Sequence, residues 1–433
     1  MNDTICAIAT SQGVGAIAII RVSGDEAIEI VNKIFKGKDL TKVSSHTINY
    51  GHIIDENKKT VDEVLVSVMK APKSFTAEDT VEINTHGGIA PTNKVLELLL
   101  ENGCRLAEPG EYTKRAFLNG RIDLLEAEAI MDMIDSKTEV QRKMAINQIS
   151  GKVSDLINQL RDDMVQIISN INVNIDYPEY DDVEVMTNEL LIPKVTNLKE
   201  RIQKILKESN NGKIIKEGIK TSIIGRPNVG KSSLLNALLE EEKAIVTDIA
   251  GTTRDIVEGQ IKVNGIVLNM IDTAGIRETK DKIEAIGVEK SLKIMEESDL
   301  ILFMLNNNEE ITPDIEELLE KLDNRKYILI INKNDLESKL DKSKLEKFAN
   351  IIINISVLNN EGIEELKNKI VELFNINELE TKDPTYLSNS RSISILKRCL
   401  TSIEDIEQGL KENRPIDMIE LDIKNIWEEL GHI

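Results

Sequence analysis

Cysteine is scarce in this sequence, and its spacing excludes two kinds of cross-linked fold. Three cysteines, Cys6, Cys104 and Cys399, are spread over 433 residues without a Cys-x-x-Cys pair. A disulfide framework or a zinc site needs clustered or regularly spaced cysteines, so neither is expected. Cys399 falls in a stretch of helical character, where a small core side chain is expected.

Histidines and long apolar runs are also few. Of the four histidines, His46, His52 and His86 lie near one another in sequence, and turn or core roles are expected for them rather than metal binding. No segment is long and apolar enough to span a membrane, and the first residues lack a signal-peptide pattern. We therefore expect a cytoplasmic protein without membrane contact.

Positive charge is the third shortage. Lysine and arginine number 54 against 75 aspartates and glutamates, which gives a net charge of −21. This balance argues against a broad nucleic-acid-binding surface, so a contact with RNA would need a local basic patch or a partner protein. The length exceeds one compact core and predicts two or three domains.

One segment of the chain has the pattern of a phosphate-binding loop. Residues 225–232 read Gly-Arg-Pro-Asn-Val-Gly-Lys-Ser, between the apolar run 219–224 and the helix-like run 233–239. In this setting the loop N–H groups and the helix N-terminus hold phosphates. Lys231 is expected to reach the β- and γ-phosphate oxygens, and the Ser232 hydroxyl to bind magnesium.

Two further motifs follow in the order of a guanine-nucleotide switch. Gly251-Thr-Thr253 offers Thr253 as a second magnesium ligand. Asp272-Thr-Ala-Gly275 closes the expected strand 267–271, where Asp272 would hold the metal through water and the Gly275 N–H would contact the γ-phosphate.

The choice of base is assigned to Asn332-Lys-Asn-Asp335, which follows the apolar strand 327–331. The Asp335 carboxylate can accept from guanine N1–H and the exocyclic amine, which adenine cannot offer. Asn332 is expected to bond the Hoogsteen edge, and the Lys333 stem to cover the base. Ser356, after the strand 351–355, would support the guanine carbonyl through nearby N–H groups.

Together these motifs predict GTP binding. The predicted contacts are Asn228, Val229, Gly230, Lys231, Ser232, Ser233, Thr247, Thr253, Asp272, Thr273, Ala274, Gly275, Asn332, Lys333, Asp335 and Ser356.

Hydrolysis needs a group that differs from the usual one. Ile276 stands where a Ras-like hydrolase carries a glutamine that orients the attacking water. The polar segment 277–289 offers candidates, among them Glu284. For Glu284 the alternative is a solvated helix face.

Secondary-structure patterns surround the GTP motifs with two other kinds of segment. The N-terminal part alternates strands, at 16–21, 64–68 and 80–83, with helices near 25–35 and 91–102, as in an α+β domain. Residues 122–210 lack glycine except Gly151 and have apolar residues at helical spacing, interrupted at Pro178, and this spacing returns at 390–431.

A nucleotide domain with adjacent ends can be inserted into another domain, so the two helical segments are expected to form one bundle. The predicted fold is multidomain α/β plus α: an N-terminal α+β domain at 1–118, a helical domain at 119–216 and 379–433, and an inserted Ras-like P-loop GTPase domain at 217–378.

The sequence resembles one family over nearly its whole length, the tRNA modification GTPase MnmE (TrmE) family. The matching segments are 3–10 (Asp-Thr-Ile-Cys-Ala-Ile-Ala-Thr), 19–24 (Ile-Ile-Arg-Val-Ser-Gly), 71–79 (Ala-Pro-Lys-Ser-Phe-Thr-Ala-Glu-Asp), His86-Gly-Gly88, 108–120, 123–129 and 244–255. The resemblance implies a homodimer whose N-terminal domain binds a tetrahydrofolate one-carbon donor, 5-formyl- or 5,10-methylene-tetrahydrofolate. With an FAD-dependent partner subunit of the MnmG (GidA) type, such proteins add an aminomethyl- or carboxymethylaminomethyl-type group at C5 of the tRNA wobble uridine. They bind tRNA mainly through that complex.

The resemblance also implies site residues. The potassium ligands of a potassium-activated GTPase match Asn228, Thr247, Ile249 and Thr252, and the carboxylate that orients water matches Glu284. Folate contacts match Arg21, Glu82 and Arg121, the last standing where the family often has lysine. Family members close with Phe-Cys-Ile-Gly-Lys near the folate site, a segment that does not appear before Ile433. GTP hydrolysis is expected not to depend on that closing segment.

Two alternatives stay open at this point. A ribosome-assembly or signalling GTPase switch without one-carbon chemistry would use the same nucleotide motifs, but it would usually carry a basic RNA module. A non-catalytic dimerisation scaffold would tolerate loss of Lys231, Thr253 or Asp272, and all three are present.

Overall fold

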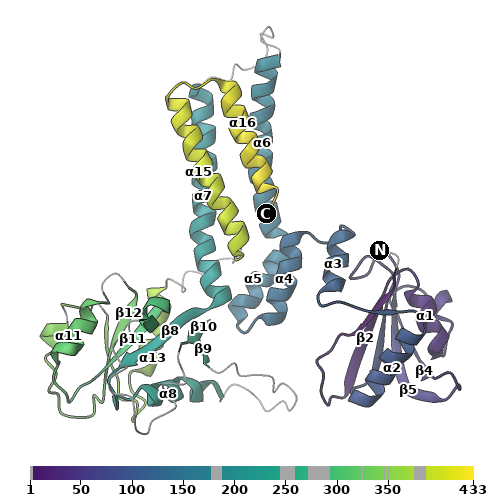
Figure 1. The fold of residues 1–433 in the computed structure, drawn as a ribbon, viewed down its shortest axis with the longest axis horizontal. Helices are drawn as coiled ribbons and strands as arrows, with labels where there is room; N and C mark the ends of the chain where they lie inside the picture. Colours follow the sequence, from purple (N-terminus) through teal and green to yellow (C-terminus); the bar gives the residue numbers. More distant parts are fainter. Residues whose placement is uncertain are drawn as a thin grey trace. The chain divides into compact units, whose positions relative to one another are not determined.

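The computed structural model describes residues 3–176, 188–243, 259–271, 293–322, 325–345, 347–349, 351–374 and 387–433 (Figure 1). They divide into two compact units, one of residues 3–128 and one formed by the described residues from 129 on. Within these ranges no helix is long and apolar enough to cross a membrane.

The first unit is built on a seven-stranded sheet in the order β3-β4-β5-β6-β2-β1-β7. The strands are β1 (Ile5–Ile8), β2 (Ile17–Ser23), β3 (Phe35–Lys36), β4 (Thr47–Ile54), β5 (Thr60–Met69), β6 (Thr80–His86) and β7 (Arg105–Leu106). All neighbouring pairs are antiparallel except β1 and β7. Alternate residues of a strand face opposite sides, so β2 buries Ile20 and Val22 in the core while Arg21 faces the other side.

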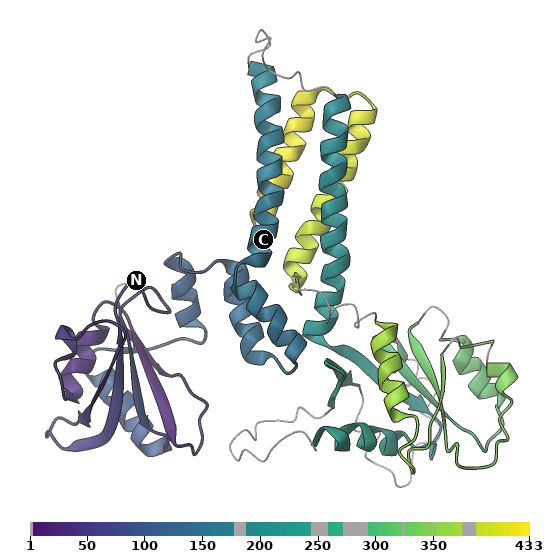
Figure 2. The ribbon, with the colours of Figure 1, turned by 180° about the vertical axis from the view of Figure 1, so that it is seen from behind.

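Helices α1 (Ala27–Ile34) and α2 (Ile89–Glu101) cover the core side of this sheet (Figure 2). Ile30 of α1 and Leu98 of α2 join Val66 and Ile83 of the strands in one buried cluster. Two further short helices, the 3-10 helix η1 (Leu40–Lys42) and α3 (Glu111–Leu118), complete the unit. The strands and helices therefore form the α+β arrangement that the alternating pattern predicts.

The second unit contains a bundle of four long helices whose members come from both sides of the second sheet in sequence. They are α6 (Lys152–Asp176), α7 (Asn188–Glu217), α15 (Ser390–Lys411) and α16 (Ile416–Leu430). Helix α15 packs on α7 and α16, and α16 packs on α6 (Figures 1 and 2). The prediction that the two helical segments form one bundle is confirmed for these residues. The predicted break at Pro178 lies outside the described residues.

Two shorter helices precede the bundle, α4 (Leu124–Asp135) and α5 (Glu139–Ile149). Helix α5 begins with a reciprocal cap, in which the Thr138 hydroxyl accepts from the Gln141 N–H and the Gln141 side chain accepts from the Thr138 N–H. The Gln141 amide also donates to the main-chain oxygen of Ile215, at 2.9 Å, and so joins the start of α5 to the end of α7.

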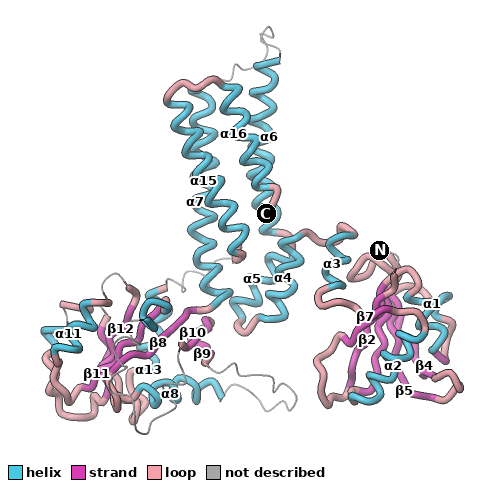
Figure 3. The backbone as a smooth tube through the Cα atoms, in the orientation of Figure 1, coloured by secondary structure: helices cyan, strands magenta, loops and turns pink. Residues whose placement is uncertain are grey.

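The second sheet has six strands in the order β13-β12-β11-β8-β10-β9, parallel except for β9 (Figure 3). The strands are β8 (Ile219–Gly225), β9 (Gln260–Val263), β10 (Ile266–Met270), β11 (Leu300–Asn306), β12 (Tyr327–Asn332) and β13 (Ile352–Asn354). The helices around it are α8 (Lys231–Lys243), α11 (Pro313–Glu320), α12 (Lys342–Leu345) and α13 (Ile363–Leu373).

Buried clusters cover both faces of this sheet. Along the central strand β11, Leu302 joins the cluster with α8 and α13, while Phe303 joins the cluster with α11. The first cluster also takes in Val140 and Met144 of α5, so the sheet and the helical segment share apolar contacts. The predicted fold class, mixed α/β with a helical bundle, is confirmed.

Candidate functional site

The segment that joins β8 to α8 has the geometry of a phosphate-binding loop. Strand β8 ends at Gly225, the chain crosses five residues, and α8 begins at Lys231, so the first N–H groups of the helix face the loop. The Lys231 Nζ donates to the main-chain oxygens of Gly225 (2.6 Å) and Arg226 (2.9 Å). Burial lowers the pKa of Lys231. Phosphate oxygens could replace these carbonyl oxygens as acceptors, and their negative charge would favour the charged form of the lysine.

The loop is tied to the end of β12 by one side chain. The Asn332 Nδ2 donates to the main-chain oxygen of Val229 at 2.8 Å, and its Oδ1 accepts from the Val357 N–H at 3.2 Å. A Cβ atom on Gly230 would collide with the Asn332 Nδ2, and Gly230 has φ of +100°, so glycine is required there. Asn332 therefore holds the phosphate loop, the end of β12 and the segment after β13 together. Its predicted bond to a base stays a prediction.

The predicted base-selecting residues meet at the same edge of the sheet. The Ser356 hydroxyl, which is fully buried, donates to Asp335 Oδ1 at 2.6 Å. Asp335 itself is exposed, and Lys333 beside it has φ of +62°. Ser356 was expected to act through nearby N–H groups, and its hydroxyl has the additional task of orienting the Asp335 carboxylate.

The remaining predicted GTP and metal residues fall into two groups. Ser232 and Ser233 lie in the first turn of α8, and Asn228 is exposed in the loop with φ of +60°. The others lie outside the described residues: Thr247, Ile249, Thr252, Thr253, Asp272, Thr273, Ala274, Gly275 and Glu284. Among the described residues, no group of three His, Cys, Asp or Glu side chains is arranged to hold a metal.

In the first unit, the predicted folate residues lie around an aromatic ring. Arg21 on β2 and Glu82 on β6 are paired in the sheet register, and Arg21 Nη2 lies 2.7 Å from Glu82 Oε1. The Arg21 guanidinium carbon lies 5.4 Å from the centre of the Phe75 ring, and that of Arg121 lies 5.2 Å from the same ring. Arg121 also donates to the main-chain oxygen of Phe75 at 3.0 Å. The structure therefore brings Arg21, Glu82 and Arg121 together.

Two aromatic side chains of this cluster were not among the predicted site residues. Phe75 contacts both arginines, and Tyr112 of α3 lies 5.6 Å from the Arg21 guanidinium while its hydroxyl donates to the Arg21 main-chain oxygen at 2.6 Å. Burial raises the pKa of Tyr112. Phe75 lies in segment 71–79 and Tyr112 in segment 108–120. Both segments carry the family resemblance, which is the signal in the sequence that could have pointed to these two residues.

A fully buried arginine holds α3 and the 71–79 loop against the first strand. Arg115 is 1% exposed, and its guanidinium bonds Asp3 (2.8 Å), Glu111 (3.0 Å) and Glu78 (3.2 Å). Glu78 accepts in addition from the Ser23 hydroxyl at 2.8 Å, on the strand that carries Arg21. The Arg105 guanidinium also bonds Glu111. These hydrogen bonds lower the pKa of the Glu111 carboxyl to about 2. This network fixes the positions of Phe75 and Tyr112.

A parallel sheet covered on both faces, a phosphate loop after β8 and an Asn-Lys-Asn-Asp segment after β12 define a P-loop GTPase. Comparisons with known proteins identify the family. A profile of the GTP-binding protein TrmE N-terminus matches residues 4–121, and a profile of the MnmE helical domain matches residues 124–433. The proteins called tRNA modification GTPase MnmE in Bacillus cytotoxicus and Bacillus anthracis are each 52% identical over 100% of this chain and 95% of their own length. The chain belongs to the MnmE family of tRNA modification GTPases.

A solved structure, the G domain of the FeoB iron transporter from T. maritima, is 30% identical, with a TM-score of 0.25. The likeness covers 36% of this chain and 98% of the FeoB G domain.

Proposed function

We propose that this protein hydrolyses GTP and, with an FAD-dependent partner subunit and a tetrahydrofolate one-carbon donor, modifies C5 of the tRNA wobble uridine. The observation that carries the proposal is full-length membership of the MnmE family, together with the meeting of Lys231, Asn332 and Asp335 at one edge of the second sheet. A parallel sheet offers its carboxyl edge for such a ligand.

The test is a deletion strain that carries only this 433-residue chain. Mass spectrometry of tRNA nucleosides from the strain should detect the modified wobble uridine, with normal ribosome profiles. Unmodified uridine with disturbed ribosome profiles would instead favour the ribosome-assembly switch. Purified protein without GTP turnover would favour the non-catalytic scaffold.

For GTP, each residue has one task. Lys231 would exchange its two carbonyl partners for β- and γ-phosphate oxygens, and the α8 N-terminus would hold the phosphates. Ser232 and Thr253 are the proposed magnesium ligands; the metal supplies charge neutralisation on the phosphates when bound. Asp335 would select guanine, with Asn332 and Ser356 holding the loops that present it.

Potassium activation is the second part of the proposal, with Asn228, Thr247, Ile249 and Thr252 as ligands. The exposure of Asn228 supports it, because an exposed residue of the phosphate loop can be reached by an ion. A bound potassium ion would supply positive charge next to the phosphates, where transition-state stabilisation is largest. Glu284 would orient the attacking water. Turnover should therefore be faster in potassium than in sodium buffer at matched ionic strength, and Asn228→Ala should blunt the difference; equal turnover in the two buffers contradicts potassium activation.

Folate binding is the third part, with Arg21, Glu82 and Arg121 as contacts. The Arg21–Glu82 pair supports it, since Glu82 could accept from the N–H edge of a pterin while the Phe75 and Tyr112 rings offer stacking surfaces. An ordinary cross-strand ion pair is the competing explanation. Calorimetry with 5-formyltetrahydrofolate tests it on this chain and on the chain extended by Phe-Cys-Ile-Gly-Lys. Absence of binding to both forms would overturn it.

The assembly is also a proposal: a homodimer through the N-terminal domain, a partner of the MnmG type, and domain boundaries at 118, 216 and 378. Light scattering of the chain and co-purification with the partner subunit test the first two. Expression of residues 217–378 alone, with retained GTP binding, tests the boundaries.

A further inference from the structure

A shallow groove lies beside the proposed folate residues, at one end of the β4–β5 hairpin. It has a volume of about 340 Å³, and its walls include His46 before β4, Lys73 after β5, and Arg121. Phe75, which contacts Arg121, forms part of it. The Phe75 ring therefore contacts both Arg21, which pairs with Glu82, and Arg121, which lines the groove.

The groove has an unusual charge for this protein. The chain carries a net charge of −21, yet no carboxylate lines the groove among its described residues, and two permanent cations and a histidine do. The neighbouring carboxylates are engaged elsewhere: Glu82 pairs with Arg21 and Glu78 with Arg115, while Asp79 accepts from the Ala71 N–H at 2.8 Å. No described carboxylate pairs with Lys73 or Arg121. These two cations are available to an anionic ligand.

The loop that carries Lys73 is held in place before any ligand binds. The Ser74 hydroxyl donates to the Glu78 main-chain oxygen at 2.5 Å, and the Asn119 amide donates to that of Thr76 at 2.7 Å. A preorganised cationic surface loses less entropy when it binds a flexible anion.

We propose that this groove binds the γ-glutamate tail of a polyglutamylated folate, and that the protein prefers such folates over the monoglutamate. The inference rests on the proposed folate function. With the pterin at Arg21 and Glu82, the p-aminobenzoyl ring would cross Phe75, and the first carboxylates would reach Arg121. Each added γ-glutamate carries one more carboxylate toward Lys73 and His46.

The test compares the calorimetric dissociation constants of 5-formyltetrahydrofolate monoglutamate and triglutamate, on the form of the chain that binds the monoglutamate. In about 50 mM salt the triglutamate should bind about fivefold tighter, and the advantage should shrink in about 0.5 M salt because surface charges are then screened. Lys73→Glu should weaken the triglutamate selectively and bring the two constants together. Retained binding of the monoglutamate by this variant shows that the first unit, which carries Lys73, is folded.

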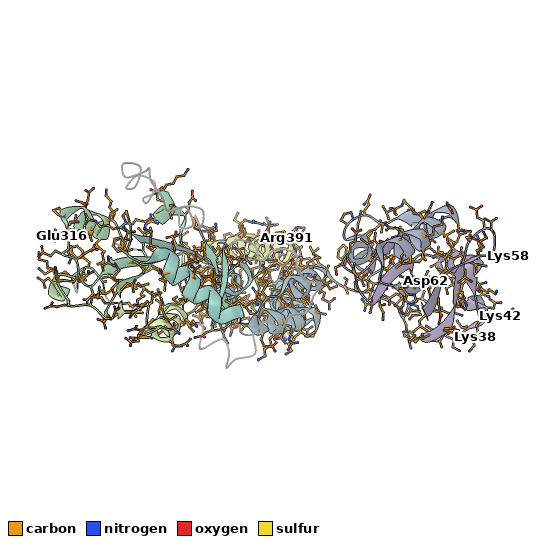
Figure 4. All side chains as sticks on the ribbon, turned by 90° about the horizontal axis from the view of Figure 1, so that it is seen from below. Lys38, Lys42, Lys58, Asp62, Glu316 and Arg391 are labelled. Carbon is orange, nitrogen blue, oxygen red and sulfur yellow. The ribbon has the colours of Figure 1, made fainter. Side chains whose placement is uncertain are left out.

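Lys58→Glu is the matched control. Lys58 lies in the turn at the other end of the same hairpin, at the edge of the first unit in Figure 4, so the same charge change occurs away from the groove. It should leave the ratio of the two constants as in the wild type. Equal affinity for the two folates in the wild type, or an equal effect of both variants, would overturn the groove assignment while folate binding stands. Binding of neither folate would overturn both.

Discussion

The Asn269 side chain on β10 donates to the main-chain oxygen of Glu217, the last residue of α7, at 2.6 Å. Its Oδ1 accepts from the Gln260 amide on β9 at 2.9 Å, and Gln260 in turn accepts from Lys137 just before α5. The β9–β10 hairpin is thus bonded to the last residue of α7 and to the residue before the cap of α5. This hairpin lies in sequence between the Gly251-Thr-Thr253 and Asp272-Thr-Ala-Gly275 motifs.

The residue between α7 and β8, next to the bond from Asn269 to Glu217, should not tolerate a side chain. Gly218 connects α7 to β8 with φ of +77°, and a Cβ atom there would lie 2.6 Å from the Val267 main-chain oxygen and 2.8 Å from Asn269 Nδ2. Gly218→Ala should destabilise the nucleotide-binding part by about 1–3 kcal/mol, through both the backbone strain and the clash. The measurement is urea unfolding, following the transition that added GDP shifts. Gly13→Ala, where an added Cβ meets nothing within 4 Å, is the control and is followed on the unfolding of the first unit, which contains it. Equal losses of stability from the two substitutions contradict the strain argument.

Local patterns were sufficient to predict the strands that carry the nucleotide motifs. The apolar runs at 219–224 and 327–331 became β8 and β12, because β-branched residues bounded by a glycine or asparagine turn favour short buried strands. The uniformly apolar run 300–305 lies in β11, a central strand, but a run without periodicity does not distinguish a strand from a buried helix segment.

Contacts between distant segments could not be predicted in this way. Asn332 was assigned to the base from its motif alone, whereas its bonds to Val229 and Val357 depend on the pairing of β12 with β11 and β13. The Phe75 and Tyr112 rings join the Arg21 site through contacts between segments distant in sequence, among them the buried Arg115 network and the Tyr112 bond to the Arg21 main chain. Such contacts need the tertiary structure.

Guanine selection should depend on the orientation of Asp335. Asp335→Asn places an amide donor opposite the exocyclic amine of guanine, so GTP affinity should fall by about 10- to 100-fold and affinity for xanthosine triphosphate should rise. Ser356→Ala removes only the hydrogen bond that orients the carboxylate, and a smaller loss of about fivefold is expected. Fluorescent-nucleotide titrations measure both constants. An Asp335→Asn protein that binds GTP like the wild type would show that the base lies elsewhere.

The pKa of His86 should lie above that of an ordinary histidine. Its Nδ1 lies 2.6 Å from the buried Asp62 carboxylate, whose other oxygen accepts the His86 main-chain N–H at 2.9 Å. The bond to Asp62 raises the pKa of His86 above 6.5. A raised folded-state pKa stabilises the fold below the unfolded pKa, and this contribution is lost as pH rises through the folded pKa.

NMR titration of the His86 ring should therefore give a midpoint above 6.5, and Asp62→Asn should lower it. A midpoint at or below 6.5 in the wild type would mean that the ring is not paired in solution.

The largest loss of stability in the first unit is expected at Arg115. Its side chain is 1% exposed and bonds three carboxylates, so Arg115→Met would leave the half-buried Glu78 without its cation and the buried Glu111 with Arg105 alone. Breaking such a buried pair from one side costs about 3–5 kcal/mol, because the uncompensated charge remains desolvated. Exposed pairs contribute about 0–1 kcal/mol, so Lys94→Met, which breaks the exposed Lys94–Glu97 pair on α2, is the matched control.

Chemical denaturation, followed by a probe in the first unit, measures both changes. Because the Arg115 network also positions Phe75 and Tyr112, Arg115→Met should weaken folate binding at temperatures where the unit is still folded, whereas Lys94→Met should not. Similar losses of stability for the two variants would show that the buried network contributes no more than a surface ion pair. Rescue of stability in Arg115→Lys would show that a positive charge is sufficient there, and failure of that rescue would assign the role to the planar, multidentate guanidinium.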